Sequence, residues 1–184
     1  MEQGNGSDLF TLTLDGERKP QPLVQSPSNK RYSAFSPDGR WFAYASGEIS
    51  GVSFNIFVEP FPPTGARYQV TSMGGRDPVW SPDGKELFFN TQVQGPNSRP
   101  GDLVSVDVHT QSGFTFGQPK LISIPGAILG GNGRNYDITP DGKQFVVVVP
   151  PPNAPGETQT RHAQQQINVV LNWFTELQQR VPVK

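Results

Sequence analysis

The stretch Ala34-Phe35-Ser36-Pro37-Asp38-Gly39-Arg40-Trp41-Phe42-Ala43-Tyr44 decides the fold, because the chain repeats it twice without gaps. The second copy runs from Val79 to Phe89, and the third runs from Asp137 to Val147. All three contain the core Ser/Thr-Pro-Asp-Gly-Lys/Arg. A motif that recurs every few tens of residues is typical of proteins built from similar units packed side by side.

The core of the repeat predicts a hairpin turn. Proline presets the first turn position, aspartate tolerates the second, and glycine takes the left-handed conformation that returns the chain into the next strand. The alternative, a catalytic or calcium-binding role for the aspartates, is weaker, because an Asp between Pro and Gly is typically a turn residue. The expected structural turn residues are Pro37, Asp38, Gly39, Pro82, Asp83, Gly84, Pro140, Asp141 and Gly142.

The residues after each turn are apolar on both faces, which predicts strands inside a stack of sheets. From Pro37 to Pro82 is 45 residues, and from Pro82 to Pro140 is 58, the second interval being lengthened by a polar insert at 92–101. A period in the forties fits four-stranded propeller blades. The other expected strands are 8–14, 21–24, 55–59, 68–71, 103–107, 120–123 and 167–173.

These strands predict an all-β fold of β-propeller blades: about three to four four-stranded antiparallel sheets in an incomplete propeller, with a short C-terminal helical turn near 174–179. We expect one domain over residues 1–184, divided into a partial blade 1–26, blades 27–72 and 73–124, and a closing blade 125–184 with a flexible linker at 150–165. Because a closed propeller needs roughly four to eight blades, we expect self-association or completion by upstream blades.

Composition narrows the function. The net charge of −1 gives no electrostatic footprint for a nucleic acid, and there is no cysteine for thiolate or zinc chemistry. No apolar run approaches the roughly 20 residues of a membrane helix, and the first residues lack the basic and apolar regions of a signal peptide. We therefore expect no nucleic-acid partner and no direct membrane insertion.

The repeats resemble the WD40-like, TolB-type β-propeller repeat, whose hallmark is the aromatic-Ser-Pro-Asp-Gly-Lys turn, and the resemblance covers almost the whole chain. More narrowly, Val58-Glu59-Pro60-Phe61-Pro62 and the ending Ile167-Asn168-Val169-Val170-Leu171-Asn172-Trp173 are similar to the C-terminal propeller of bacterial, especially acidobacterial, eukaryotic-like serine/threonine kinases. The resemblance implies a sensor or scaffold outside the membrane. The chain itself contains no kinase motif.

Candidate chemistry elsewhere is weak. Gly47-Glu48-Ile49-Ser50-Gly51 has the wrong spacing for a nucleophile elbow, and neither His109 nor His162 has a visible catalytic partner. The glycines of 126–133 have no following helix pattern and no lysine at the offset of a phosphate loop, so we interpret them as a blade connection. We expect no catalysis, no cofactor and no metal.

Propeller geometry indicates where a ligand or partner would bind. The connections between the second and third strands, and between blades, open on one face around the channel, opposite the Pro-Asp-Gly turns. The residues expected to converge there are Arg76, Asp77, Arg134, Asn135 and Tyr136. Inter-blade hydrogen bonds and ion pairs among these residues are the alternative.

The sequence thus predicts a non-catalytic module for protein interaction or ligand sensing, with a protein or small-molecule ligand that the sequence does not identify. We expect it in the C-terminal part of a larger bacterial sensor serine/threonine kinase or exported multidomain protein, hence in the periplasm or otherwise outside the cytoplasm. The alternatives are the accessory propeller of a prolyl-oligopeptidase-like serine peptidase and a TolB-like periplasmic scaffold.

Overall fold

A computed structural model describes residues 6–47, 53–91, 102–125, 127, 129 and 133–149. The chain divides into two units, Met1–Pro150 and Pro151–Lys184, and every described residue belongs to the first. Its strands are β1 (Leu9–Leu12), β2 (Pro20–Val24), β3 (Asn29–Phe35), β4 (Trp41–Gly47), β5 (Phe54–Pro60), β6 (Tyr68–Gln69), β7 (Arg76–Trp80), β8 (Glu86–Asn90), β9 (Leu103–His109), β10 (Thr115–Phe116), β11 (Lys120–Ile122), β12 (Tyr136–Ile138) and β13 (Phe145–Val147).

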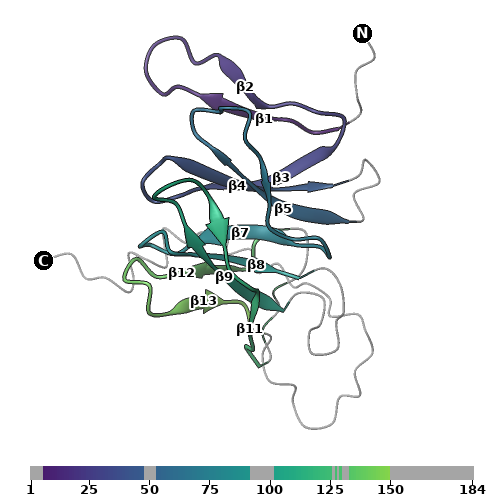
Figure 1. Cartoon of the computed structure of the whole chain (residues 1–184), viewed down its shortest axis with the longest axis vertical. Helices are drawn as coiled ribbons and strands as arrows, with labels where there is room; N and C mark the ends of the chain where they lie inside the picture. The colour runs from purple at the N-terminus through teal and green to yellow at the C-terminus, as the bar shows by residue number, and fades with distance from the viewer. Residues whose placement is uncertain are drawn as a thin grey trace, which may run out of the picture. The chain divides into compact units, whose positions relative to one another are not determined.

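The strands form four antiparallel sheets that follow one another along the first unit (Figure 1). Two are complete: β3-β4-β5-β6, and β7-β8-β9 with β10 and β11 both paired to β9. Two are half as wide, β1-β2 and β12-β13. The prediction of an all-β, incomplete propeller is confirmed, whereas the helical turn at 174–179, the strand at 167–173, the linker at 150–165 and the insert at 92–101 lie outside the described residues.

The three predicted hairpin turns are confirmed, and they share one hydrogen-bond pattern. In the first, the Ser36 hydroxyl donates to Asp38 Oδ1 at 2.7 Å, and the backbone N–H of Arg40 donates to the same oxygen at 3.1 Å. Ser81 with Asp83 and Thr139 with Asp141 repeat both contacts. The turn glycines Gly39, Gly84 and Gly142 have φ of 69°, 70° and 70°. The aspartates therefore fix the turns, as the sequence predicts.

The turn aspartates make the stability of the fold depend on pH. Hydrogen bonds from the Ser36 hydroxyl and the Arg40 N–H lower the pKa of Asp38 from 3.8 to about 2. Because the folded pKa is depressed, this contribution is present above pH 3.8 and is lost as the pH falls toward 2. Asp38→Ala should destabilise the fold by about 1 kcal/mol at pH 7. The difference in urea midpoint between the natural chain and this variant should shrink as the pH falls from 3.8 toward 2. A difference that is constant with pH would contradict this explanation.

The largest core lies between the two complete sheets. Trp41, Phe54 and Ile56 pack there against Trp80 and Leu87, and all five are less than 9% exposed. The position just before β7 is a glycine, Gly75, because neighbouring side chains leave no room for a Cβ. A Cβ at this position would lie 2.8 Å from Ile56 Cγ1 and 3.3 Å from Phe89 Cδ2. A smaller cluster joins β8 and β9 to β12-β13.

The third repeat departs from the expectation that both faces are buried. Val146 of β13 is 65% exposed, whereas the equivalent residues Ala43 and Phe88 are 0% and 3% exposed. The reason is that β12-β13 packs on β8 and β9 with one face, through Tyr136, Phe145 and other residues. No described sheet covers its other face.

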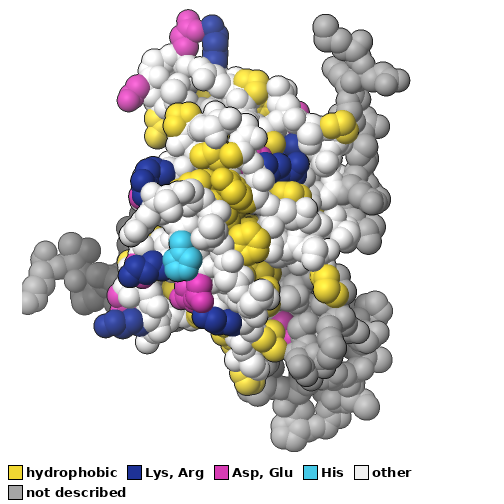
Figure 2. Space-filling view, viewed as in Figure 1, with side chains coloured by type: hydrophobic (Ala, Val, Ile, Leu, Met, Phe, Trp, Pro, Cys, Tyr) yellow, Lys and Arg dark blue, Asp and Glu magenta, His cyan; other side chains and the backbone are white. Residues whose placement is uncertain are grey.

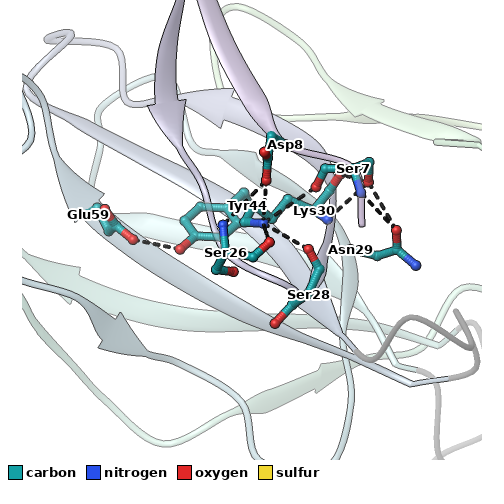
Figure 3. A network of polar contacts seen from close by, with 8 residues as sticks. All are labelled: Ser7, Asp8, Ser26, Ser28, Asn29, Lys30, Tyr44 and Glu59. Carbon is teal, nitrogen blue, oxygen red and sulfur yellow. Dashed lines mark hydrogen bonds and ion pairs between the residues drawn. The ribbon is translucent and has the colours of Figure 1, made fainter. Parts of the chain in front are cut away.

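A buried lysine holds the sheet β1-β2 to the first complete sheet (Figure 3). Lys30 Nζ donates to Asp8 Oδ1 and to the backbone carbonyls of Ser26 and Ser28, each at 2.8 Å. The Lys30 side chain is 1% exposed and that of Asp8 is 26% exposed. The Asn29 side chain also accepts the Ser7 N–H at 3.0 Å. Because the ammonium is surrounded by oxygen acceptors, its burial is compensated.

Candidate functional site

The candidate residues lie where the first strand of each repeat begins, at the strand end away from the Pro-Asp-Gly turns. Arg76 and Asp77 open β7, and Arg134 and Asn135 immediately precede Tyr136, the first residue of β12. Both Arg76 and Arg134 influence the ionisation of Asp77 electrostatically. The structure therefore brings residues from two successive repeats into one cluster.

Asp77 and Tyr136 form the buried part of this cluster. Asp77 is 2% exposed, and its backbone carbonyl accepts a hydrogen bond from the Tyr136 hydroxyl. Asp77 Oδ2 accepts from Asn90 Nδ2 at 3.2 Å, and Asn90 Nδ2 also reaches the carbonyl of Leu129. These contacts connect β7 and β8 of one sheet to β12 of the next. Asp77 and Tyr136 therefore hold in place the more exposed residues of the cluster that lie above them.

Burial controls the ionisation of both residues. Desolvation raises the pKa of the Asp77 carboxyl, and the Asn90 hydrogen bond with the charges of Arg76 and Arg134 opposes that rise. Desolvation also raises the pKa of the Tyr136 hydroxyl well above its ordinary value. Asp77 Oδ1 and Asn90 Oδ1 are buried, and neither has a hydrogen-bond partner among the described residues. Asp77 thus carries a desolvation cost in its ionised form.

Arg76 is held between the first and second repeats. Its guanidinium donates to the Tyr32 hydroxyl and lies over two rings, 5.0 Å from the Tyr32 centroid and 5.6 Å from the Phe54 centroid. Arginine stacks on aromatic faces because its planar cation is attracted by the electron-rich ring. Arg76 is half-buried, and its Nε has no hydrogen-bond partner among the described residues.

Arg134 and Asn135 provide the accessible part of the cluster. Arg134 Nη2 lies 3.5 Å from Asp137 Oδ2, with side-chain exposures of 43% and 57%. The backbone carbonyl of Asn135 accepts the Val148 N–H at 3.2 Å, and the residue itself is half-buried, whereas Arg134 is exposed. An ion pair this exposed contributes little to stability, which leaves the guanidinium available to another anion.

One member of the set was missed by the sequence reasoning. Counting back five residues from the Ser or Thr of each turn core gives Arg31, Arg76 and Arg134, so every repeat carries an arginine at the same position. Arg31 is exposed, with its guanidinium 5.8 Å from the Phe54 centroid. The same repeat alignment that identifies the turns could have found it. Tyr32 and Asp77, one residue later, share a left-handed φ of 57° and 53°.

The opposite face carries a groove of about 560 Å³ between the first two turns and the β9-β10 hairpin. Asp38, Arg40, Asp83, Lys85 and His109 contribute its charged or titratable side chains. Asp38 pairs with Arg40 at 2.7 Å and Asp83 with Lys85 at 3.5 Å, so the basic groups have internal partners. The face drawn in Figure 2 likewise interleaves basic and acidic side chains around exposed hydrophobic ones.

Other classes of site are not found in the part of the chain that the structure describes. Within those ranges no three His, Asp or Glu side chains are grouped as metal ligands. The same described residues include no helix of the length and apolarity needed to cross a membrane.

Comparison with known proteins identifies the fold. No protein-family model matches the chain, and no curated protein matches it. A solved structure named as a TolB of Agrobacterium tumefaciens matches 77% of this chain and 45% of its own, with a TM-score of 0.56 and 21% identity. TolB from Acinetobacter baumannii matches 80% of this chain and 44% of its own, with a TM-score of 0.46 and 21% identity. The chain spans less than half the length of either, and its fold is that of TolB-type β-propeller blades.

Proposed function

We propose that this chain is a non-catalytic propeller module that binds an anionic segment of a protein partner. The surface is the end of the repeats opposite the Pro-Asp-Gly turns. Arg31 and Arg134 are exposed there, Arg76 and Asn135 are half-buried, and Asp77 and Tyr136 lie beneath them. The observation that carries the proposal is the arginine at one equivalent position in all three repeats. Turn formation and core packing explain the other repeated residues, but they do not require this one.

The chemistry favours a carboxylate or another planar anion. Guanidinium groups offer paired donors that match a carboxylate, and a clustered set of them attracts a partner at long range. Neither Arg31 nor Arg76 makes an ion pair with a described carboxylate. Asp77 is the buried acid near Arg76 and Arg134, and burial raises its pKa, which reduces its competition for the same cations; the pair of Arg134 with Asp137 is exposed and weak.

Reversing the charge of Arg134 should weaken binding of an acidic peptide. With a fluorescein-labelled peptide of alternating Glu and Gly, fluorescence anisotropy should give roughly tenfold weaker binding for Arg134→Glu, equivalent to about 1.4 kcal/mol. Arg18→Glu is the matched control, since Arg18 is an exposed arginine of the β1-β2 loop, and it should change binding less than twofold. Equal losses in both variants would mean that only net charge is sensed.

We further propose that the module works outside the cytoplasm within a larger bacterial polypeptide, such as a sensor serine/threonine kinase. The support is the motif resemblance of the blades and of the ending at 167–173, together with the fold shared with TolB. An immunoblot of source cells with an antibody against residues 167–184 tests it. A band several times 20.1 kDa in an extracytoplasmic or membrane fraction is expected. A 20.1 kDa cytoplasmic band would contradict it.

A further inference from the structure

The two narrow sheets are complementary halves of one blade. Sheet β12-β13 contains the third Pro-Asp-Gly turn, so it corresponds to β3-β4 and β7-β8, the first and second strands of a blade. Sheet β1-β2 corresponds to the third and fourth strands, because Asp8-Leu9 at the start of β1 aligns with Asn55-Ile56 of β5 and with Asp102-Leu103 at the start of β9. One half is thus at each end of the described series of sheets (Figure 1).

Each half has an open edge where the other would pair. In the complete sheets, β5 pairs with β4 as well as β6, and β9 pairs with β8 as well as its outer strands. Among the described strands, β1 pairs only with β2 and β13 pairs only with β12. Unpaired edges of this kind are templates for another strand.

Each half also has one apolar face without a neighbour. Phe10 is 52% exposed, whereas Val104, the equivalent residue of β9, is 5% exposed against the preceding sheet. Val146 is 65% exposed, whereas the equivalent Phe88 is 3% exposed against the following sheet. Leu12 and Leu14 extend the first face, and Val148 extends the second. Both ends therefore lack the neighbouring blade that the repeat provides elsewhere.

We propose that a second copy of this chain fills both gaps, with β13 of one copy pairing antiparallel with β1 of the other, and the reverse. The result is a twofold-symmetric closed ring. Each copy contributes two complete sheets and two halves, so two copies make six blades, within the range in which propellers close. Three copies would make nine, beyond that range, and one copy would make three.

The register of the shared blade follows from the complete sheets. Ala43 lies opposite Val58 in β4-β5, and Phe88 lies opposite Ser105 in β8-β9. The equivalent residues at the junction are Val146 and Thr11. In this register both point to the same side of the new sheet, toward β3-β4 of the second copy, where Phe35 is 49% exposed. Phe10 and Leu12 point to the other side, toward the sheet β7-β11 of the first copy, and Leu14 follows just beyond the end of β1.

The area that becomes buried suits a stable dimer. Six exposed apolar side chains on each copy lie at the junctions: Phe10, Leu12, Leu14, Phe35, Val146 and Val148. These side chains are 49–77% exposed, so at roughly 100 Å² apiece they bury on the order of 1,200 Å² over two copies before strand edges are included. Stable specific interfaces bury about 1,200 to 2,000 Å².

A mixed disulfide tests the junction directly, because the chain has no cysteine of its own. Thr11→Cys and Val146→Cys are prepared as separate full-length variants, one with a size tag, mixed through a denaturation and refolding step, and oxidised. The mixed disulfide should dominate over either homodisulfide, because directly opposed Cα atoms lie about 4.5–5.5 Å apart. Gln21→Cys, on the far strand β2, is the matched control and should not cross-link to Val146→Cys.

Light scattering completes the test. The full chain at tens of micromolar should have a mass of twice 20.1 kDa. Val146→Asp should convert it to a monomer that keeps its far-UV circular dichroism. Leu121→Asp should stay dimeric, because this exposed leucine of β11 lies opposite Val104, on the face of its sheet turned away from the junction. A 20.1 kDa monomer, a growing polymer or no mixed disulfide would overturn the proposal. A monomer would instead point to preceding blades of a longer polypeptide, or to residues 167–173 of the same chain, as the source of the missing strand.

Discussion

Lys30→Ala is expected to lower the melting temperature by roughly 6–12 °C, which corresponds to about 3 kcal/mol for a chain of this size. The Lys30 side chain is 1% exposed, and its ammonium makes 2.8 Å contacts with Asp8 Oδ1 and with the carbonyls of Ser26 and Ser28. Truncation leaves the acceptors drawn in Figure 3 without their donor, and it also removes a buried side chain. Removing one member of a buried pair costs about 3–5 kcal/mol, and the 26% exposure of Asp8 favours the low end.

Two further variants identify the cause of that loss. Lys19→Ala removes a lysine that is 78% exposed and pairs with Glu17, and it should change stability by less than about 0.5 kcal/mol. Asp8→Asn keeps a hydrogen-bond acceptor for Lys30 and should have an intermediate effect. If Lys30→Ala melted like Lys19→Ala in differential scanning calorimetry, the ion pair would not attach β1-β2 to the sheet beside it.

The hairpin turns could be predicted residue by residue because their cause is local. Proline, aspartate and glycine act within five residues of one another, so the sequence order alone contains the information. The strand positions followed for the same reason, and β5, expected at 55–59, is observed at Phe54–Pro60. The short strand β10 was not predicted, since two residues, Thr115 and Phe116, are too few for a periodic pattern.

The contacts between blades could not be predicted, because residues equivalent in the repeat have different roles in different blades. Lys30, Gly75 and Gly133 occupy equivalent positions in the three repeats. Lys30 is a buried cation bound to oxygen atoms, whereas Gly75 lies so close to Ile56 that no side chain fits there. The next residues are all arginines, yet Arg76 stacks on Tyr32 while Arg134 faces Asp137. What packs against a position depends on the neighbouring blade, which is distant in the sequence.

The candidate site combines both kinds of information. The repeat alignment places its five predicted residues at the start of the first strands, but only the structure separates the buried Asp77 and Tyr136 from the exposed Arg134. The hydrogen bond from the Tyr136 hydroxyl to the Asp77 carbonyl spans 59 residues of sequence. A variant of either buried residue therefore changes the support of the surface as well as its chemistry, which is why Arg134 is the better test of binding.

Asp77→Val is expected to destabilise the fold by about 3 kcal/mol. Asp77 has a φ of 53°, a left-handed conformation that costs an L-residue roughly 1–2 kcal/mol and is least favourable for a β-branched one. Valine also removes the acceptor that Asn90 uses at 3.2 Å, and loss of a buried hydrogen bond costs about 1–3 kcal/mol. Urea unfolding at pH 7 measures the change, and a loss below about 1 kcal/mol would contradict both reasons.

Asp77→Asn is the matched control and should be at least as stable as the natural chain at pH 7. Asparagine tolerates the left-handed conformation, still accepts from Asn90 and carries no charge to desolvate. Because burial raises the folded pKa of Asp77 above 3.8, ionisation favours the unfolded chain increasingly as the pH rises from 3.8 to that folded value, and the cost to folding is constant above it. The advantage of the amide should therefore grow with rising pH and vanish below pH 3.8. An advantage that grew on acidification would mean that the carboxylate stabilises the junction between β7 and β12, and that Asp77 is bound by the arginines rather than desolvated beneath them.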